Sequence, residues 1–164
     1  MKYLPLENIT YNSKLSPEEI IKVLNQNLEP YQTFRITGFG QSKKHKLFEG
    51  EISNSSFNIR RIIGYRNSFL PAISGTIEKD REGSKIIVKM RLHNLVLGFM
   101  ILWFGGVIFA LLAFSSSTLF TGTFNKVSLI PIGMLIFGYA LVLGGFKYES
   151  IKSKKCLAEL FDSK

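Results

Sequence analysis

The sequence predicts an α+β domain followed by a two-helix transmembrane hairpin and a C-terminal amphipathic helix. Three observations lead to this prediction: a capped amphipathic segment near the N-terminus, about five strand-like runs after it, and two long uncharged apolar runs. The expected boundaries are residues 1–94 for the domain, 95–146 for the hairpin and 147–164 for the last helix.

The first element is a helix that begins after Ser16. Ser16 can cap it, Pro17 fits its first position, and Glu19 completes a capping box. Apolar residues then recur at helical spacing: Ile20, Val23, Leu24 and Leu28. This single apolar stripe predicts a helix that packs on one face of a sheet.

Five runs rich in β-branched and aromatic residues follow, separated by turn residues. They are residues 33–39, 46–53, 57–65, 69–79 and 84–93. The last run alternates most clearly, with Ile86, Val88 and Met90 on one face. Because short connections favour antiparallel neighbours, we expect an antiparallel sheet of about five strands.

The two apolar runs, residues 95–114 and 127–146, are each 20 residues long and contain no Asp, Glu, Lys, Arg or His. A helix of this length spans roughly 30 Å, the thickness of the hydrocarbon core of a bilayer. In the first run, the Leu, Ile, Val and Phe residues alone favour insertion by roughly 4 to 8 kcal/mol. A hydrophobic helical hairpin in a soluble protein is the less favoured alternative.

The basic residues predict the orientation of this hairpin. They precede the first span and follow the second: Arg81, Lys85, Lys89, Arg91, Lys147, Lys152, Lys154 and Lys155. The connection between the spans contains a single basic residue, Lys126. The N-terminus has no stretch typical of a signal peptide. By the positive-inside rule, both termini are expected on the cytoplasmic side of the inner membrane.

The segment after the second span is expected to begin with an interface anchor formed by Lys147 and Tyr148. Residues 148–164 have a partial apolar stripe, and docking on the sheet is favoured over a free tail. Cys156 is the only cysteine, so an intramolecular disulfide is impossible. Its S-palmitoylation is less expected than simple packing.

Small residues in the spans suggest close helix packing. Gly106 and Ala110 form one pair, and Ala140 and Gly144 form the other. Packing within the hairpin is the first interpretation of these pairs, and homo-oligomerisation is the alternative.

Chemical motifs are sparse. The chain has two histidines and no cluster with metal-ligand spacing, no cofactor motif and no recognisable catalytic triad. The spans contain no ionisable residue, which argues against a transport path formed by this chain alone. The sequence therefore predicts a protein that is not an enzyme and has no metal or cofactor.

The strongest candidate site is basic. Arg60, Arg61 and Arg66 gather around one predicted hairpin, and guanidinium groups suit phosphates and carboxylates. If Arg61 points inward it needs a partner, for which Glu78 or Glu51 would serve. Three more candidates lie at the end of the last strand, next to the membrane: Lys89, Arg91 and His93. The alternative for the three arginines of the hairpin is a solvated strand face.

Residues 60–71, Arg-Arg-Ile-Ile-Gly-Tyr-Arg-Asn-Ser-Phe-Leu-Pro, lie upstream of Met90-Arg91-Leu92-His93 and the two spans. In this arrangement the chain resembles small bacterial two-span membrane proteins without an assigned function. A β-rich domain with a helical hairpin and a closing helix is also similar to membrane-attached pleckstrin-homology-like domains. That resemblance implies a sheet that is a scaffold for lipid or protein contacts.

Three functional hypotheses follow. The first is a non-enzymatic, membrane-anchored module that binds a partner protein or assists an assembly. The second is recognition of anionic lipid headgroups by the basic surface near the membrane. The third is an accessory subunit of a membrane enzyme or transporter. The net charge of +9 does not favour nucleic acid, because the basic residues crowd toward the membrane.

Overall fold

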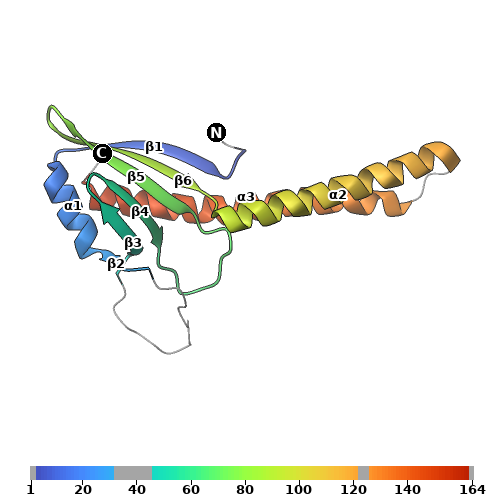
Figure 1. Cartoon of the computed structure of the whole chain (residues 1–164), viewed down its shortest axis with the longest axis horizontal. Coiled ribbons are helices and arrows are strands. Elements are labelled where there is room, and N and C mark those ends of the chain that lie inside the picture. Colours follow the sequence, from blue (N-terminus) through green and yellow to red (C-terminus); the bar gives the residue numbers. More distant parts are fainter. Residues whose placement is uncertain (1–2, 32–45, 122–125, 163–164) are drawn as a thin grey trace.

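The computed structural model describes residues 3–31, 46–121 and 126–162. A six-stranded sheet lies at one end of the molecule, and a helical hairpin extends from this domain to the opposite end (Figure 1). In chain order the elements are β1 (Leu6–Ser13), α1 (Pro17–Gln26), β2 (Leu28–Glu29), β3 (Phe48–Ser53), β4 (Ser56–Arg61), β5 (Ala72–Asp80), β6 (Gly83–Arg91), α2 (Asn94–Thr121), η1 (Lys126–Ser128) and α3 (Leu129–Leu160).

The strand order in the sheet is β1-β6-β5-β4-β3-β2. All neighbours are antiparallel except β2 and β3, which are parallel. The α+β class is therefore confirmed. The prediction of an antiparallel sheet of about five strands was wrong, because the sheet has six strands and one of its pairs is parallel. The expected strand at 33–39 lies outside the described residues.

Strand β1 is the main element that the sequence pattern missed. Among the described strands it pairs with β6 alone, from Leu6 opposite Arg91 to Ser13 opposite Ser84. An edge strand buries one face incompletely, and here that face carries Ile9, Tyr11 and Ser13 while polar residues fill the positions between them. The alternation of hydrophobicity is therefore weak in this segment.

Helix α1 begins as predicted. The Ser16 hydroxyl accepts a hydrogen bond from the Glu19 amide at 3.3 Å, and the Glu19 carboxylate accepts one from the Ser16 amide at 2.8 Å. Its apolar stripe buries Ile20 and Leu24 in the core. The helix lies across the end of the sheet that is farthest from the hairpin (Figure 1).

The face of the sheet is covered by the second half of α3. Four buried residues, Phe146, Ser150, Ser153 and Leu157, form one stripe along this half. Phe161 follows the helix and packs on Phe57, with 6.3 Å between ring centroids. The predicted docking of this segment on the sheet is confirmed. The prediction of a separate C-terminal helix was wrong, because α3 continues from the second apolar run into the domain without a break.

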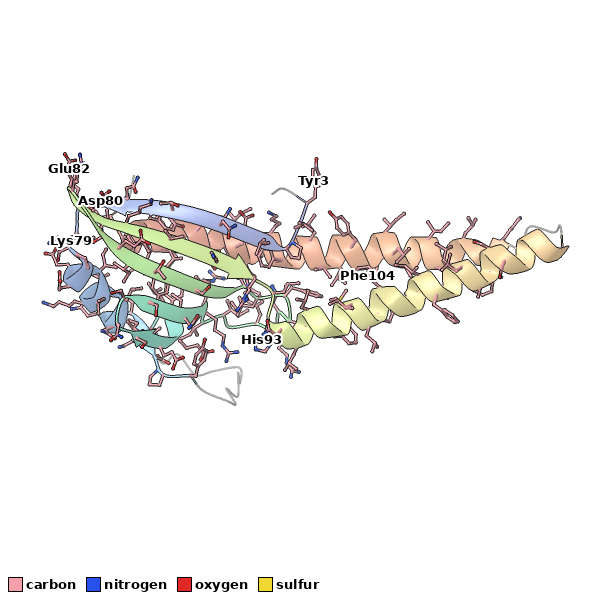
Figure 2. All side chains as sticks on the ribbon, turned by 45° about the horizontal axis from the view of Figure 1, so that its top comes forward. Tyr3, Lys79, Asp80, Glu82, His93 and Phe104 are labelled. Atoms are coloured by element: carbon pink, nitrogen blue, oxygen red, sulfur yellow. The ribbon has the colours of Figure 1, made fainter. Side chains whose placement is uncertain are left out.

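The helices α2 and α3 run side by side away from the domain (Figure 2). Both contain stretches long and apolar enough to cross a membrane, and only 11% and 17% of their most apolar windows are buried. The two helices pack near Gly138, where an added Cβ would lie 3.5 Å from both Trp103 and Phe104. A Cβ at Gly106 or Gly144 would meet nothing within 4 Å, so these glycines do not form the predicted contact within the hairpin.

Candidate functional site

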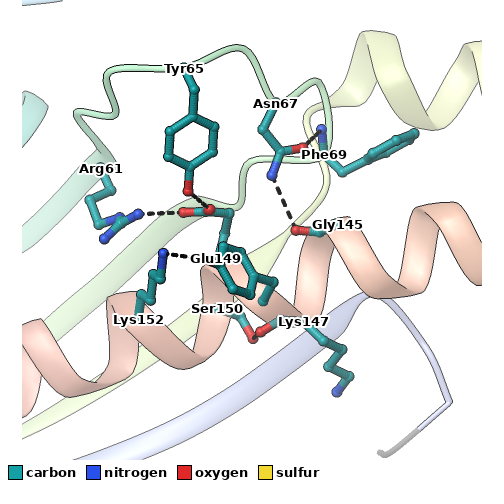
Figure 3. Close-up of polar contacts among 10 residues, drawn as sticks. Arg61, Tyr65, Asn67, Phe69, Gly145, Lys147, Glu149, Ser150 and Lys152 are labelled. Atoms are coloured by element: carbon teal, nitrogen blue, oxygen red, sulfur yellow. Dashed lines mark hydrogen bonds and ion pairs between the residues drawn. The ribbon is translucent and has the colours of Figure 1, made fainter.

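The connection between β4 and β5 lies at the end of the sheet that faces the hairpin. Strand β4 ends at Arg61 and β5 begins at Ala72, so residues 62–71 form a loop instead of the tight hairpin expected from the sequence. This 62–71 loop lies against α3 at residues 145–149 (Figure 3).

A buried carboxylate is at the centre of this contact. The Glu149 side chain is fully buried and accepts a 2.5 Å hydrogen bond from Nη2 of Arg61. Its other oxygen accepts a hydrogen bond from the Tyr65 hydroxyl. Burial and the hydrogen bond to Glu149 raise the pKa of Tyr65, which keeps this hydroxyl a donor. Arg61 thus points inward, but its partner is Glu149 and not the expected Glu78 or Glu51.

Two further contacts fix the loop on α3. Asn67 Nδ2 donates a hydrogen bond to the Gly145 carbonyl of α3 at 3.2 Å. Within the loop, Asn67 Oδ1 accepts a hydrogen bond from the Phe69 amide at 2.9 Å. The Phe69 ring lies directly over Gly145, where an added Cβ would be 2.9 Å from Phe69 Cδ2. The absence of a side chain at Gly145 therefore leaves the space in which the Phe69 ring lies against the helix.

On its other side the loop forms a groove with the start of α2. The groove has a volume of about 540 Å³ and is lined by Arg66, Asn67, Ser68, Phe69, Leu95, Val96 and Phe99. Arg66 is exposed and makes no hydrogen bond or ion pair with any described residue. The groove therefore combines the Arg66 guanidinium, which is unpaired among the described residues, with an apolar wall.

The remaining basic candidates lie on the face of the sheet opposite α3, here called the outer face. Arg60 pairs with Glu49 there, and its guanidinium lies 5.5 Å from the centre of the Tyr31 ring. Lys89 and Arg91 alternate with the buried Val88 and Met90, so both are exposed on this face. The three arginines of the predicted cluster thus point in three directions.

Arg91 and His93 share a polar hollow of about 330 Å³ at the end of the outer face near the hairpin. Its lining includes Tyr31, Glu51, Asn58 and Ser74. His93 Nδ1 also accepts a 3.3 Å hydrogen bond from the Leu95 amide at the start of α2. His93 therefore supports the turn from β6 into α2 (Figure 2).

The predicted anchor residues lie where α3 enters the domain. Lys147 and Lys154 both pair with Glu7 of β1, Lys154 at 3.0 Å. Burial raises the pKa of Glu7, but the two lysines together lower it more, and the net result is a pKa below the usual value. Tyr148 is exposed, and its ring lies 3.9 Å from Nζ of Lys152. The membrane-anchor role of Lys147 and Tyr148 stays a prediction.

The last two features of the described residues concern metal binding and the reactivity of Cys156. Within residues 3–31, 46–121 and 126–162, no three His, Cys, Asp or Glu side chains are placed to hold a metal ion. Cys156 is half-buried, and burial together with Glu159 raises the pKa of its thiol, so the thiol stays protonated and weakly nucleophilic. The described contacts of the site are suited to binding charged or polar groups.

No protein-family model, curated protein or solved structure matches this chain.

Proposed function

We propose that the chain is a two-pass integral membrane protein whose α+β domain is a non-enzymatic binding module held rigidly at the cytoplasmic surface. The observation that carries this proposal is the continuity of α3. One 32-residue helix supplies both the second candidate span and the stripe that closes the core of the domain. A span and a domain that share one helix cannot move independently.

The exposed surface of the hairpin supports its place in a bilayer. Large apolar side chains are open along both helices, among them Leu102 at 76%, Ile136 at 66% and Phe137 at 68% exposed. Soluble proteins rarely leave so extended an apolar surface in water. Lipid would cover this surface, and the helices satisfy their own backbone hydrogen bonds.

The charge distribution supports the cytoplasmic side for the domain and both termini. Residues 1–94 carry 15 Lys and Arg against 9 Asp and Glu, whereas Lys126 is the only charged residue between the two spans. The positive-inside rule places the basic ends in the cytoplasm.

The outer face of the sheet is the surface we assign to a protein partner. Helix α3 covers the opposite face, and the described part of the chain places no helix over the outer one (Figure 1). Lys89, Arg91 and Glu51 give this face both signs of charge, and the 330 Å³ hollow gives it a recess. A polar, mixed-charge surface with a recess suits a non-obligate protein interface.

Membrane orientation is tested by cysteine labelling in a Cys156→Ser background. Arg81→Cys places a thiol at the exposed tip of the domain, and Lys126→Cys places one between the spans. We expect a membrane-impermeant reagent to label Lys126→Cys in intact cells and Arg81→Cys only after lysis. The reverse pattern would overturn the orientation, and labelling of both in intact cells would overturn the cytoplasmic location of the domain.

Partner binding is tested with a photo-crosslinking residue introduced in the full chain. Position 74 lies in the hollow of the outer face, and position 79 lies on the same strand at the end remote from the membrane. We expect one defined crosslinked protein from position 74, and loss of that product with Arg91→Glu. Equal products from both positions would contradict a specific outer-face partner.

A further inference from the structure

We infer that the groove between the 62–71 loop and α2 binds a single anionic phospholipid, with its phosphate at Arg66 and an acyl chain along Leu95, Phe99 and Trp103. This inference rests on the membrane placement proposed above. It adds a ligand, and a site distinct from the outer face that we assign to a protein partner.

The polar end of the groove is suited to a phosphate. Arg66 is exposed, has no partner among the described residues, and presents a planar guanidinium that can bind two phosphate oxygens at once. Among the residues that the structure describes, no acidic side chain lines the groove, and the exposed Ser68 adds a hydroxyl. The first turn of α2 contains no acidic residue either, so the positive end of the helix dipole adds to the potential.

The apolar end of the groove continues along α2 as an exposed strip. Leu95, Phe99 and Trp103 are spaced by four residues and so share one face of the helix. They are 78%, 60% and 39% exposed, and the rings of Phe99 and Trp103 stack with centroids 6.4 Å apart. The strip is about 12 Å long at the helical rise of 1.5 Å per residue.

The combination of the two ends selects the ligand. A free phosphate would engage Arg66 and leave the strip uncovered, and a neutral lipid would cover the strip without compensating the cation. An anionic phospholipid satisfies both, because its headgroup and acyl chain are joined at the depth where α2 begins. The direction of the strip, from the domain into the hairpin, is the direction in which such a chain enters a bilayer.

The groove is also preorganised. Asn67 and Phe69, on either side of Ser68, are fixed on α3 through Gly145, so the loop that carries Arg66 is already held in place. A binding group on a fixed loop loses little conformational entropy when a ligand arrives.

Trp103 provides the test, because it is the only tryptophan in the chain and ends the proposed acyl-chain strip. The full chain is reconstituted into bilayers that contain either a brominated phosphatidylglycerol or a brominated phosphatidylcholine, and quenching of Trp103 fluorescence is measured. We expect the anionic lipid to compete for the site near Trp103 about fivefold better than the zwitterionic lipid, the factor expected for one basic residue at an anionic surface.

Two variants localise this preference. Arg66→Gln should reduce the ratio of anionic to zwitterionic lipid binding to about one. Arg81→Gln, at the exposed tip of the β5–β6 turn, should leave this ratio unchanged. Inorganic phosphate engages Arg66 but has no acyl chain, so at constant ionic strength it should reduce the preference only in large excess over the lipid. Loss of the preference at a phosphate concentration equal to that of the lipid would overturn the assignment to a lipid.

The outcomes separate this inference from the proposed function. Equal quenching by the two lipids, or a preference that survives Arg66→Gln, would overturn the lipid site and leave the membrane hairpin intact. No quenching by either lipid would mean that Trp103 is outside the hydrocarbon core, which would overturn both.

Discussion

The two halves of α3 are parts of one helix with opposite surfaces. In the half next to α2, the large apolar side chains Ile136 and Phe137 are exposed. In the half under the sheet, the fully buried residues are Phe146, Glu149, Ser150, Ser153 and Leu157, and charged residues such as Lys155 and Glu159 are exposed. The first surface suits lipid as its solvent, and the second suits a protein core with water beyond it.

The change from one surface to the other occurs at residues 145–149, where the 62–71 loop contacts the helix. Gly145 supplies the space for Phe69, and Glu149 supplies the buried acceptor for Arg61 and Tyr65. The second candidate span and the domain are thus joined by a loop that docks on a continuous helix instead of by a linker. The following predictions test how much the fold depends on that contact.

The largest effect is expected from removal of the buried carboxylate. Glu149→Leu leaves the largely buried Arg61 side chain without its counter-charge, and breaking such a pair costs about 3–5 kcal/mol of unfolding free energy. The double variant Arg61→Met with Glu149→Leu should cost less than the single variant. Denaturant unfolding of the full chain in detergent measures both, and equal losses would contradict a coupled pair.

Gly145 should give the next largest effect, with Gly144 as a matched control. Gly145→Ala places a Cβ 2.9 Å from the Phe69 ring and should lower the unfolding free energy by about 1–2 kcal/mol. Gly144→Ala meets nothing within 4 Å and should stabilise the helix by up to about 1 kcal/mol. Thermal unfolding in detergent distinguishes them, and equal shifts would mean that the loop does not rest on Gly145.

The contact of Gly145 and Glu149 with the loop was beyond prediction from the sequence, although its parts were visible. The apolar runs and the capping box at Ser16 have local signals, so the candidate spans and the start of α1 were predictable. An inward direction of Arg61 followed only if its side chain shares the strand face of Phe57 and Ile59. Its partner did not, because Glu149 is 88 residues away and nothing local distinguishes a carboxylate that will be buried.

The edge of the sheet shows the same limit. Strand β1 depends on pairing with β6, which is more than 70 residues later in the chain, and its own polar residues resemble a loop. The groove at Arg66 had only one local signal, the group of arginines at residues 60–66. Its second wall, formed by Leu95, Val96 and Phe99, is defined only when the loop docks on α3.

A smaller, pH-dependent effect is expected at Glu7, which joins β1 to the domain half of α3. Since Lys147 and Lys154 hold its pKa below the usual 4.5, the carboxylate stabilises the fold above pH 4.5, and this contribution is lost as the pH falls through the lower folded-state value. Glu7→Gln should cost about 1 kcal/mol at neutral pH and weaken the pH dependence below 4.5. Unfolding measured from pH 7 to pH 3 tests this, and parallel curves for both proteins would contradict it.

The smallest effect on stability is expected on the outer face. Lys89 is exposed and has no partner among the described residues, so Lys89→Ala should change the unfolding free energy by no more than about 0.5 kcal/mol. The same variant should weaken the crosslink from position 74, because a charged rim residue contributes to the rate and specificity of association. A loss of stability comparable to that of Gly145→Ala would mean that the outer face is part of the folded core. A loss confined to the crosslink would show that the residues that hold the domain on α3 differ from the residues that the domain presents to a partner.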